Sequence, residues 1–156
     1  MRKLTIRREF IMEHSFHYML MVNQSIFHKK LFDYLKPSDL TLGQPKVLDY
    51  LKDFDGMTQK DIAKACQIEP TSAAKVLQGM EEKGMIERRM LNGNRRSLHV
   101  FLTEKGRKLQ KEVEDAFQAL EREAFRGMER EEISRFMESF FTIYENLQRM
   151  GGQKDK

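Results

Sequence analysis

Arginine is concentrated in one short stretch of the chain, residues 86–102. Between Arg88 and Phe101 there are four arginines and no acidic residue, although the whole chain carries a formal net charge of only +4. Guanidinium groups bind phosphate through rigid, forked donors, so such a stretch suits the backbone of a nucleic acid. A basic segment on an ordinary solvated surface has the same composition, and the stretch alone does not decide between the two.

The same stretch has the spacing of a β-hairpin. In its two flanking segments apolar residues alternate with polar ones, which is the period of a strand with one buried face. Asn92-Gly93 lies between the segments and tolerates the positive φ angles of a tight hairpin turn. The sequence therefore predicts a two-stranded ribbon with arginines near its tip.

Two short helices are predicted immediately before this hairpin. Thr58 is a suitable N-cap for the first helix, and residues 67–69 interrupt its apolar pattern. Pro70 fits the first turn of the second helix, and Gly84 fits the position just past its end. Two helices joined by a tight turn and followed by a basic hairpin are the elements of a winged helix-turn-helix.

The second short helix offers polar side chains and no acid between Pro70 and Met80. They are Thr71, Ser72, Lys75 and Gln78. Hydroxyl, ammonium and amide groups can contact phosphates or base edges, so this helix is the candidate recognition element for DNA. For the two helices taken without the hairpin, an ordinary helical pair is the alternative.

The run from Thr58 to Gly106 resembles the winged-helix core of the MarR family of bacterial and archaeal transcriptional regulators. The resemblance is carried by the elements TQKDIA, EPTSAAKVLQGMEEKGMIERR, NRR and LTEKGR, which occur in the family's order and at near-family spacing. Flanking helices extend the resemblance over about residues 10–150.

The resemblance implies roles for individual residues. The recognition helix becomes Pro70 to Lys83, and Arg88 matches a family arginine that contacts the DNA backbone. Thr58 and Gln59 lie where helix-turn-helix proteins commonly bind phosphate. The predicted DNA-binding residues are Thr58, Gln59, Pro70, Thr71, Ser72, Lys75, Gln78, Arg88, Arg95 and Arg96.

The predicted wing departs from the family pattern at Asn94. Asn94-Arg95-Arg96 stands where the family usually has Asp-x-Arg, whose arginine enters the minor groove. Arg96 keeps the matching arginine, and narrow minor grooves attract arginine electrostatically. The carboxylate that would orient the wing is missing, so the assignment between Arg95 and Arg96 is left open.

Long helices are predicted on both sides of this region. They cover residues 10–35, residues 103–126 and a last helix with apolar positions from Ile133 to Leu147, while a capping-box pattern at residues 41–44 starts a shorter helix. A helix that is apolar on more than one face in so small a chain must be buried twice. In the family, such terminal helices interlock into a homodimer. The predicted dimerisation residues are Phe10, Phe16, Leu20, Phe136, Phe140, Tyr144 and Leu147.

The predicted fold class is mainly α with a small β-hairpin wing. Residues 1–36 and 107–156 would form the helical dimerisation region, and residues 37–106 the winged helix-turn-helix, all within one compact domain. A two-fold symmetric dimer predicts a pseudo-palindromic double-stranded DNA operator with half-sites about one helical turn apart.

Three groups of residues are candidates for a sensing role. His14, His17 and His28 share one predicted helix, but no cysteine or dense carboxylate cluster accompanies them, so core or interface histidines are favoured over a metal site. Cys66 closes the first short helix, whereas peroxide-sensing relatives place their cysteine in the first long helix. Methionines of the terminal helices could line a pocket for a small aromatic effector, although loose core packing explains them equally well. They are Met12, Met19, Met21, Met128, Met137 and Met150.

Length and composition bear on the number of domains, the cellular location and the possibility of an enzyme. The chain has 156 residues with 40% hydrophobic and 33% charged content, which is typical of one helix-rich globular domain. No signal peptide or membrane-length apolar run is visible, and one cysteine permits no internal disulfide, so a cytoplasmic location without membrane contact is expected. No cofactor is expected, and no nucleophile–base pair, phosphate-binding loop or metal-spaced cluster suggests an enzyme.

The sequence thus predicts a homodimeric, sequence-specific DNA-binding transcriptional regulator. In the family this is most often a repressor, released by a small molecule that favours a dimer geometry unfit for DNA. The alternative is a winged helix that serves as a protein-interaction module without specific DNA binding.

Overall fold

The computed structural model describes residues 15–94 and 97–150. Two compact units are distinguished, Met1–Leu120 and Glu121–Lys156. The predictions made for Phe10, Met12, His14, Arg95 and Arg96 fall outside the described residues. The division into a dimerisation region and a DNA-binding region stays a prediction.

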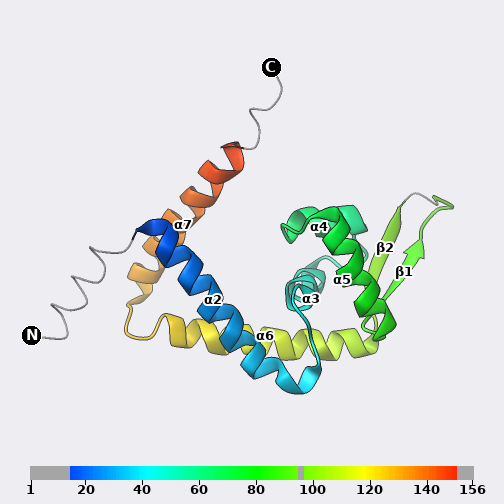
Figure 1. The fold of residues 1–156 in the computed structure, drawn as a ribbon, viewed down its shortest axis with the longest axis horizontal. Helices are drawn as coiled ribbons and strands as arrows, with labels where there is room; N and C mark the ends of the chain where they lie inside the picture. Colours follow the sequence, from blue (N-terminus) through cyan, green and yellow to red (C-terminus); the bar gives the residue numbers. More distant parts are fainter. Residues whose placement is uncertain (1–14, 95–96, 151–156) are drawn as a thin grey trace, which may run out of the picture. The chain divides into compact units, whose positions relative to one another are not determined.

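Helices make up most of the described residues, and the predicted fold class is confirmed (Figure 1). In chain order the elements are α2 (Phe16–Leu35), the short 3-10 helix η1 (Lys36–Ser38), α3 (Gln44–Asp53), α4 (Gln59–Ala65), α5 (Pro70–Glu82), β1 (Ile86–Met90), β2 (Leu98–Leu102), α6 (Glu104–Ala124) and α7 (Arg130–Met150).

Side-chain caps set the start of several helices. The hydroxyl of Thr58 accepts a hydrogen bond from the backbone N–H of Asp61 at 3.1 Å, as predicted for the start of α4. At α3 the expected capping box is only half formed. The Gln44 side chain accepts from the backbone N–H of Thr41 at 3.0 Å, but the N-cap is Gly43 with φ 90°. The helix therefore begins after the predicted cap, since a left-handed residue precedes it.

The core of the first unit joins α3, α4 and α5 to the hairpin and to α6. Leu48, Leu51, Ile62, Leu77 and Met80 are fully buried. Each such side chain contributes about 1.5–3 kcal/mol through removal of apolar surface from water. The core therefore fixes α5 against α3 and α4 on one side of the helix.

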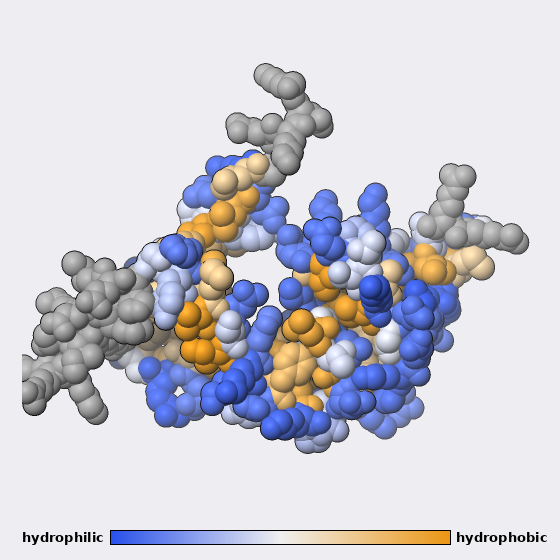
Figure 2. All heavy atoms as spheres, viewed as in Figure 1, coloured by the Kyte–Doolittle hydropathy of each residue, from blue (hydrophilic) through white to orange (hydrophobic). Residues whose placement is uncertain are grey.

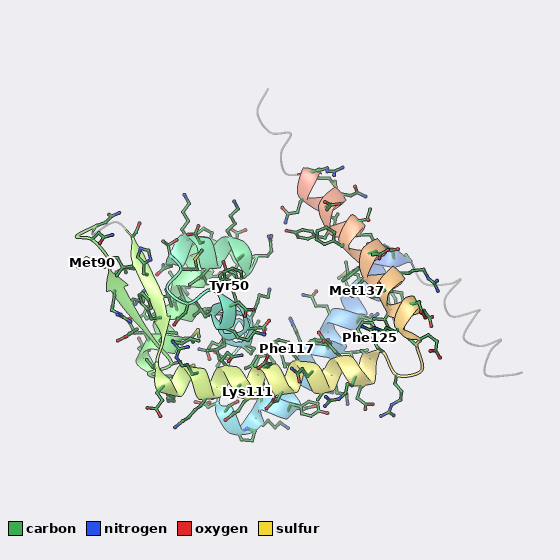
Figure 3. The ribbon with its side chains drawn as sticks, turned by 180° about the vertical axis from the view of Figure 1, so that it is seen from behind. Tyr50, Met90, Lys111, Phe117, Phe125 and Met137 are labelled. Atoms are coloured by element: carbon green, nitrogen blue, oxygen red, sulfur yellow. The ribbon has the colours of Figure 1, made fainter. Side chains whose placement is uncertain are left out.

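The long helix α2 joins this core through its C-terminal half only. Leu31 and Leu35 are buried, and the ring of Phe27 stacks on that of Phe117 with 6.1 Å between centroids. Phe117 is labelled on α6 in Figure 3. The predicted apolar stripe of this helix is therefore half buried, because Phe16 and Leu20 toward its N-terminus are exposed.

The hairpin is antiparallel and pairs Ile86 with Leu102 at its base and Met90 with Leu98 at its far end. The predicted turn is present, since Asn92 and Gly93 have φ angles of 55° and 69°. The ladder stops before this turn, so the connection is longer than a two-residue loop. The alternating apolar pattern is buried only near the base, and Met90 and Leu98 remain exposed.

A segment before α4 pairs with β2 from the other side. Gly56 N–H donates to the Val100 carbonyl at 2.8 Å, and Val100 N–H donates to the Met57 carbonyl at 2.9 Å. Thr58 and His99 form an isolated bridge, and His99 Nδ1 lies 2.7 Å from the Gly56 carbonyl oxygen. These contacts, which the sequence did not indicate, attach the wing to the start of the helix-turn-helix.

The N-terminal turn of α6 lies against the base of the hairpin. A Cβ at Gly106 would stand 1.9 Å from the Met85 carbonyl oxygen, a backbone atom that also accepts the N–H of Thr103 at 3.1 Å. Only glycine permits this approach.

The second unit holds the end of α6, a turn with Gly127 at φ 82°, and α7. Phe125 packs edge-on against Phe136 at 6.2 Å, and Phe136 stacks on Phe140 at 5.6 Å between centroids. No residue of α7 is buried, and Figure 2 shows hydrophobic residues gathered along this helix. Within the described residues, no helix combines the length and apolarity needed to cross a bilayer.

Candidate DNA-binding surface

Helix α5 turns one polar face away from the core. Successive helical residues are rotated by about 100°, so Ala73, Leu77 and Met80 form one face, which is buried. Thr71 and Lys75 lie on the opposite face and are exposed. Their side chains make no hydrogen bond or ion pair with another described residue, which leaves the hydroxyl and ammonium groups available to an external acceptor or donor.

The other predicted residues of α5 occupy different positions around the helix. Gln78 is exposed on the outward face, but its amide donates to Glu82 Oε1 at 3.0 Å. Pro70 is exposed at the first helical turn, as predicted. Ser72 is also exposed, yet it lies with Val76 on a flank of α5 that lines a cavity. Thr71 and Lys75 therefore form the centre of the outward face, and Ser72 lies at its edge.

The opposite flank of α5 holds Arg88 of β1. Glu81 Oε2 accepts from Arg88 Nη2 at 2.6 Å and from Nε at 3.0 Å, while Glu81 Oε1 accepts the Arg88 backbone N–H at 3.2 Å. Arg88 Nη1 also donates to Gln59 Oε1 at 3.3 Å. The guanidinium hydrogen bonds lower the pKa of Glu81. The network ties α5, β1 and α4 together, and contact of Arg88 or Gln59 with DNA stays a prediction.

The hydroxyl of Thr58 is used within the protein. It accepts the Asp61 backbone N–H and donates to Asp61 Oδ2 at 2.7 Å. This geometry explains the start of α4, and the predicted phosphate contact by Thr58 is not tested by it.

The described arginines of the wing are paired with acids that precede Arg88 in the chain. Arg88 is paired with Glu81, and Arg89 Nη2 lies 2.9 Å from Glu87 Oε1. The Arg89 guanidinium also lies 3.9 Å from the centroid of the Phe101 ring. Counting charge within residues 88–101 therefore overstates the free positive charge of this part of the wing.

The predicted dimerisation residues that the structure describes are all exposed. They belong to the N-terminal half of α2 and to α7, and they are Phe16, Leu20, Phe136, Phe140, Tyr144 and Leu147. A set of exposed aromatic and leucine side chains this large is unusual for a monomer.

A cavity of about 620 Å³ lies within the first unit, between α2, α3, α5 and α6. Its aromatic walls are Phe27, Phe32 and Phe117, and polar groups come from His28, Lys46, Asp49 and the turn before α5. None of the described methionines that were predicted to line an effector pocket, Met19, Met21, Met128, Met137 and Met150, is among its lining residues. The sequence did not indicate this cavity, because its walls come from four helices that are far apart in the chain.

The surroundings of Cys66 and His17 do not favour a redox or metal-sensing role. Cys66 is buried, its thiol lies 3.8 Å from the Lys46 carbonyl oxygen, and burial raises the pKa of the thiol. The higher pKa disfavours the reactive thiolate. His17 Nε2 lies 3.2 Å from the Ser15 hydroxyl. Within the described part of the chain, no group of at least three His, Cys, Asp or Glu side chains is placed to hold a metal ion.

Residues 40–98 match the model of the MarR family. The fold is similar to that of S. aureus MepR in a complex with DNA, with 27% identity, a TM-score of 0.78, and coverage of 86% of this chain and 99% of that chain. A MarR family transcriptional regulator from Listeria monocytogenes, complexed with 26mer DNA, has 19% identity and a TM-score of 0.78 over 92% of this chain and 99% of that one. The transcriptional repressor CouR, bound to a 23-mer DNA duplex, has 24% identity and a TM-score of 0.75 over 83% of this chain and 92% of that one.

Proposed function

We propose that this chain is a homodimeric, sequence-specific DNA-binding repressor of the MarR family that acts in the cytoplasm. Its match to the model of that family covers residues 40–98. The observation that carries the proposal is the outward face of α5, on which the side chains of Thr71 and Lys75 are exposed and without a partner among the described residues. Their side chains can reach base edges and phosphates when the helix enters a major groove. The repressor CouR and S. aureus MepR, which share the fold, were solved on DNA.

The homodimer is supported by the exposed apolar faces of α2 and α7. Phe16 and Leu147 are each 55% exposed, and burying the exposed half of such a side chain in a partner contributes roughly 1 kcal/mol. A two-fold dimer would present two copies of α5 to a pseudo-palindromic operator.

Release by a small effector is supported by the cavity beside α5. A ligand there would touch Ser72 and Val76 of α5 as well as Phe27 of α2. It would therefore favour one placement of α5 relative to α2, and it would lower DNA affinity if that placement differs from the DNA-bound one.

Fluorescence anisotropy with genomic and random duplexes, titrated with salt, tests the proposal. We expect a few genomic fragments to bind at least about a thousandfold more tightly than random DNA, with affinity that falls steeply as salt increases. Light scattering on the same sample should give twice the mass of one chain. Weak DNA binding that does not depend on the DNA sequence would instead favour a winged helix that binds a protein partner. The pairing of Arg88 with Glu81 and of Arg89 with Glu87, which neutralises both guanidinium charges, is consistent with that alternative.

A further inference from the structure

The cavity beside α5 has the size and walls of a ligand site. Its volume of about 620 Å³ falls within the roughly 300–1,000 Å³ typical of small-molecule sites. Phe27, Phe32 and Phe117 supply aromatic surface, which binds flat rings and also attracts cations to the ring face. The aromatic walls favour a ligand that contains a ring, and the polar groups of the cavity decide which charge that ligand carries.

The carboxylate of Asp49 is a partly buried charge on the wall of this cavity. Asp49 is half-buried, and its carboxylate makes no hydrogen bond or ion pair with any described residue. The cation nearest in sequence on the cavity wall, Lys46, donates its ammonium to the Cys66 carbonyl at 2.9 Å. Lys52, on the next turn of α3, lies 3.3 Å from Glu114 Oε1. Neither ammonium makes a hydrogen bond or ion pair with the Asp49 carboxylate, although the charge of Lys52 acts on it from a distance.

Burial without a partner has an energetic consequence for this group. Loss of water around Asp49 raises the pKa of its carboxyl, and the nearby charges of Asp53 and Glu114 raise it further, against the lowering effect of Lys52. A carboxylate in this state gains more from an incoming cation than a hydrated one does. Glu69 adds a second acid at the cavity, and its carboxylate too has no partner among the described residues.

We propose that the cavity binds an organic cation that carries an aromatic ring, with the cation at Asp49 and the ring against Phe27, Phe32 and Phe117. This proposal rests on the proposed function, because it specifies the chemical class of the effector. Bound in this way, the ligand would connect α2 and α3 to the Ser72 and Val76 flank of α5.

Matched naphthalene compounds separate the effect of charge from that of the ring. The probes are 1-naphthylmethylamine, 1-naphthylmethanol and 1-naphthoate, each titrated into the full-length protein by calorimetry near neutral pH. We expect the amine to bind at least about tenfold more tightly than the alcohol, and the carboxylate to bind most weakly. A tenfold preference corresponds to about 1.4 kcal/mol.

Two variants assign the preference to one side chain. Asp49→Asn should remove the preference for the amine over the alcohol while leaving the affinity for the alcohol unchanged, which also shows that the cavity is intact. Asp53→Asn is the control, since Asp53 is an exposed acid on the same helix that does not line the cavity. The Asp53→Asn variant should keep at least about two thirds of the difference in binding free energy between the amine and the alcohol, because it loses only a long-range Coulomb interaction.

The outcomes are distinct for this inference and for the proposed function. Equal binding of amine and alcohol, tighter binding of the carboxylate, failure of all three probes, or a preference that survives Asp49→Asn would each overturn the inference. The anisotropy assay reports separately on DNA. Specific DNA binding without any preference for the amine would leave the DNA-binding function in place, whereas preference for the amine without DNA binding would leave the cation site in place.

Discussion

Replacing Gly106 by alanine tests how the wing is held against α6. The added Cβ would lie 1.9 Å from the Met85 carbonyl oxygen and 3.2 Å from Leu102 Cδ2, whereas ordinary contact begins at about 3.4 Å. Because the nearest atom belongs to the backbone, no side-chain rotation relieves the clash. The N-terminal turn of α6 must move away from the hairpin base by about 1.5 Å, and the hydrogen bond from Thr103 N–H to Met85 is lost.

The expected cost follows from three contributions. Overpacking costs up to about 3 kcal/mol, and the lost backbone hydrogen bond costs about 1 kcal/mol. Alanine in place of glycine within a helix returns about 1 kcal/mol. The net loss in the free energy of unfolding is therefore at most about 3 kcal/mol, which for a chain of this size would lower Tm by roughly 6–12 °C.

Urea denaturation measures this loss, at a fixed protein concentration because the apparent stability of the proposed dimer would depend on it. Gly79→Ala is the matched control. Its Cβ would meet only the Gln44 side-chain nitrogen at 3.5 Å, so helix propensity should make this variant up to about 1 kcal/mol more stable. If Gly106→Ala is as stable as the wild type, or if both variants lose equally, the clash at Met85 is not what makes glycine necessary.

The remaining predictions concern charge and assembly. Lys75→Ala should weaken DNA binding and reduce the salt slope by about one unit in anisotropy, as expected for one lost phosphate contact, whereas the exposed Lys108→Ala should leave both unchanged. Glu81→Gln should cost about 1 kcal/mol in urea denaturation near neutral pH. Since Arg88 lowers the pKa of Glu81, the pair stabilises the fold above the ordinary value of 4.5, and the difference between variant and wild type should vanish as pH falls through the lowered pKa. Phe140→Glu should halve the mass measured by light scattering, because the charge cannot be buried in a partner.

Elements that depend on neighbouring residues were predicted well from the sequence. Thr58, Pro70 and Gly84 mark helix ends through local backbone chemistry, and the structure places α4 and α5 between them. The positive φ angles at Asn92 and Gly93 follow from the same kind of local preference. Such features need no knowledge of distant contacts.

Contacts between distant residues were not predictable in this way. The pairing of Arg88 with Glu81 crosses from a strand to a helix, and no periodicity relates the two positions. The contact between Gly106 and Met85 depends on how α6 meets the hairpin, and the bridge between Thr58 and His99 spans the helix-turn-helix. The cavity walls likewise come together only when the helices pack.

Ser72 and Thr71 are adjacent in sequence, yet they face different surroundings on a helix of 13 residues. If α5 reads an operator on one side and contacts an effector on the other, mutations at the boundary would alter both properties at once. A change at Ser72 selected for a new operator would also reshape the cavity wall. Among descendants of this chain, operator preference and effector preference would then be inherited as linked traits, whereas changes at Thr71 or Lys75 would leave the cavity as it is.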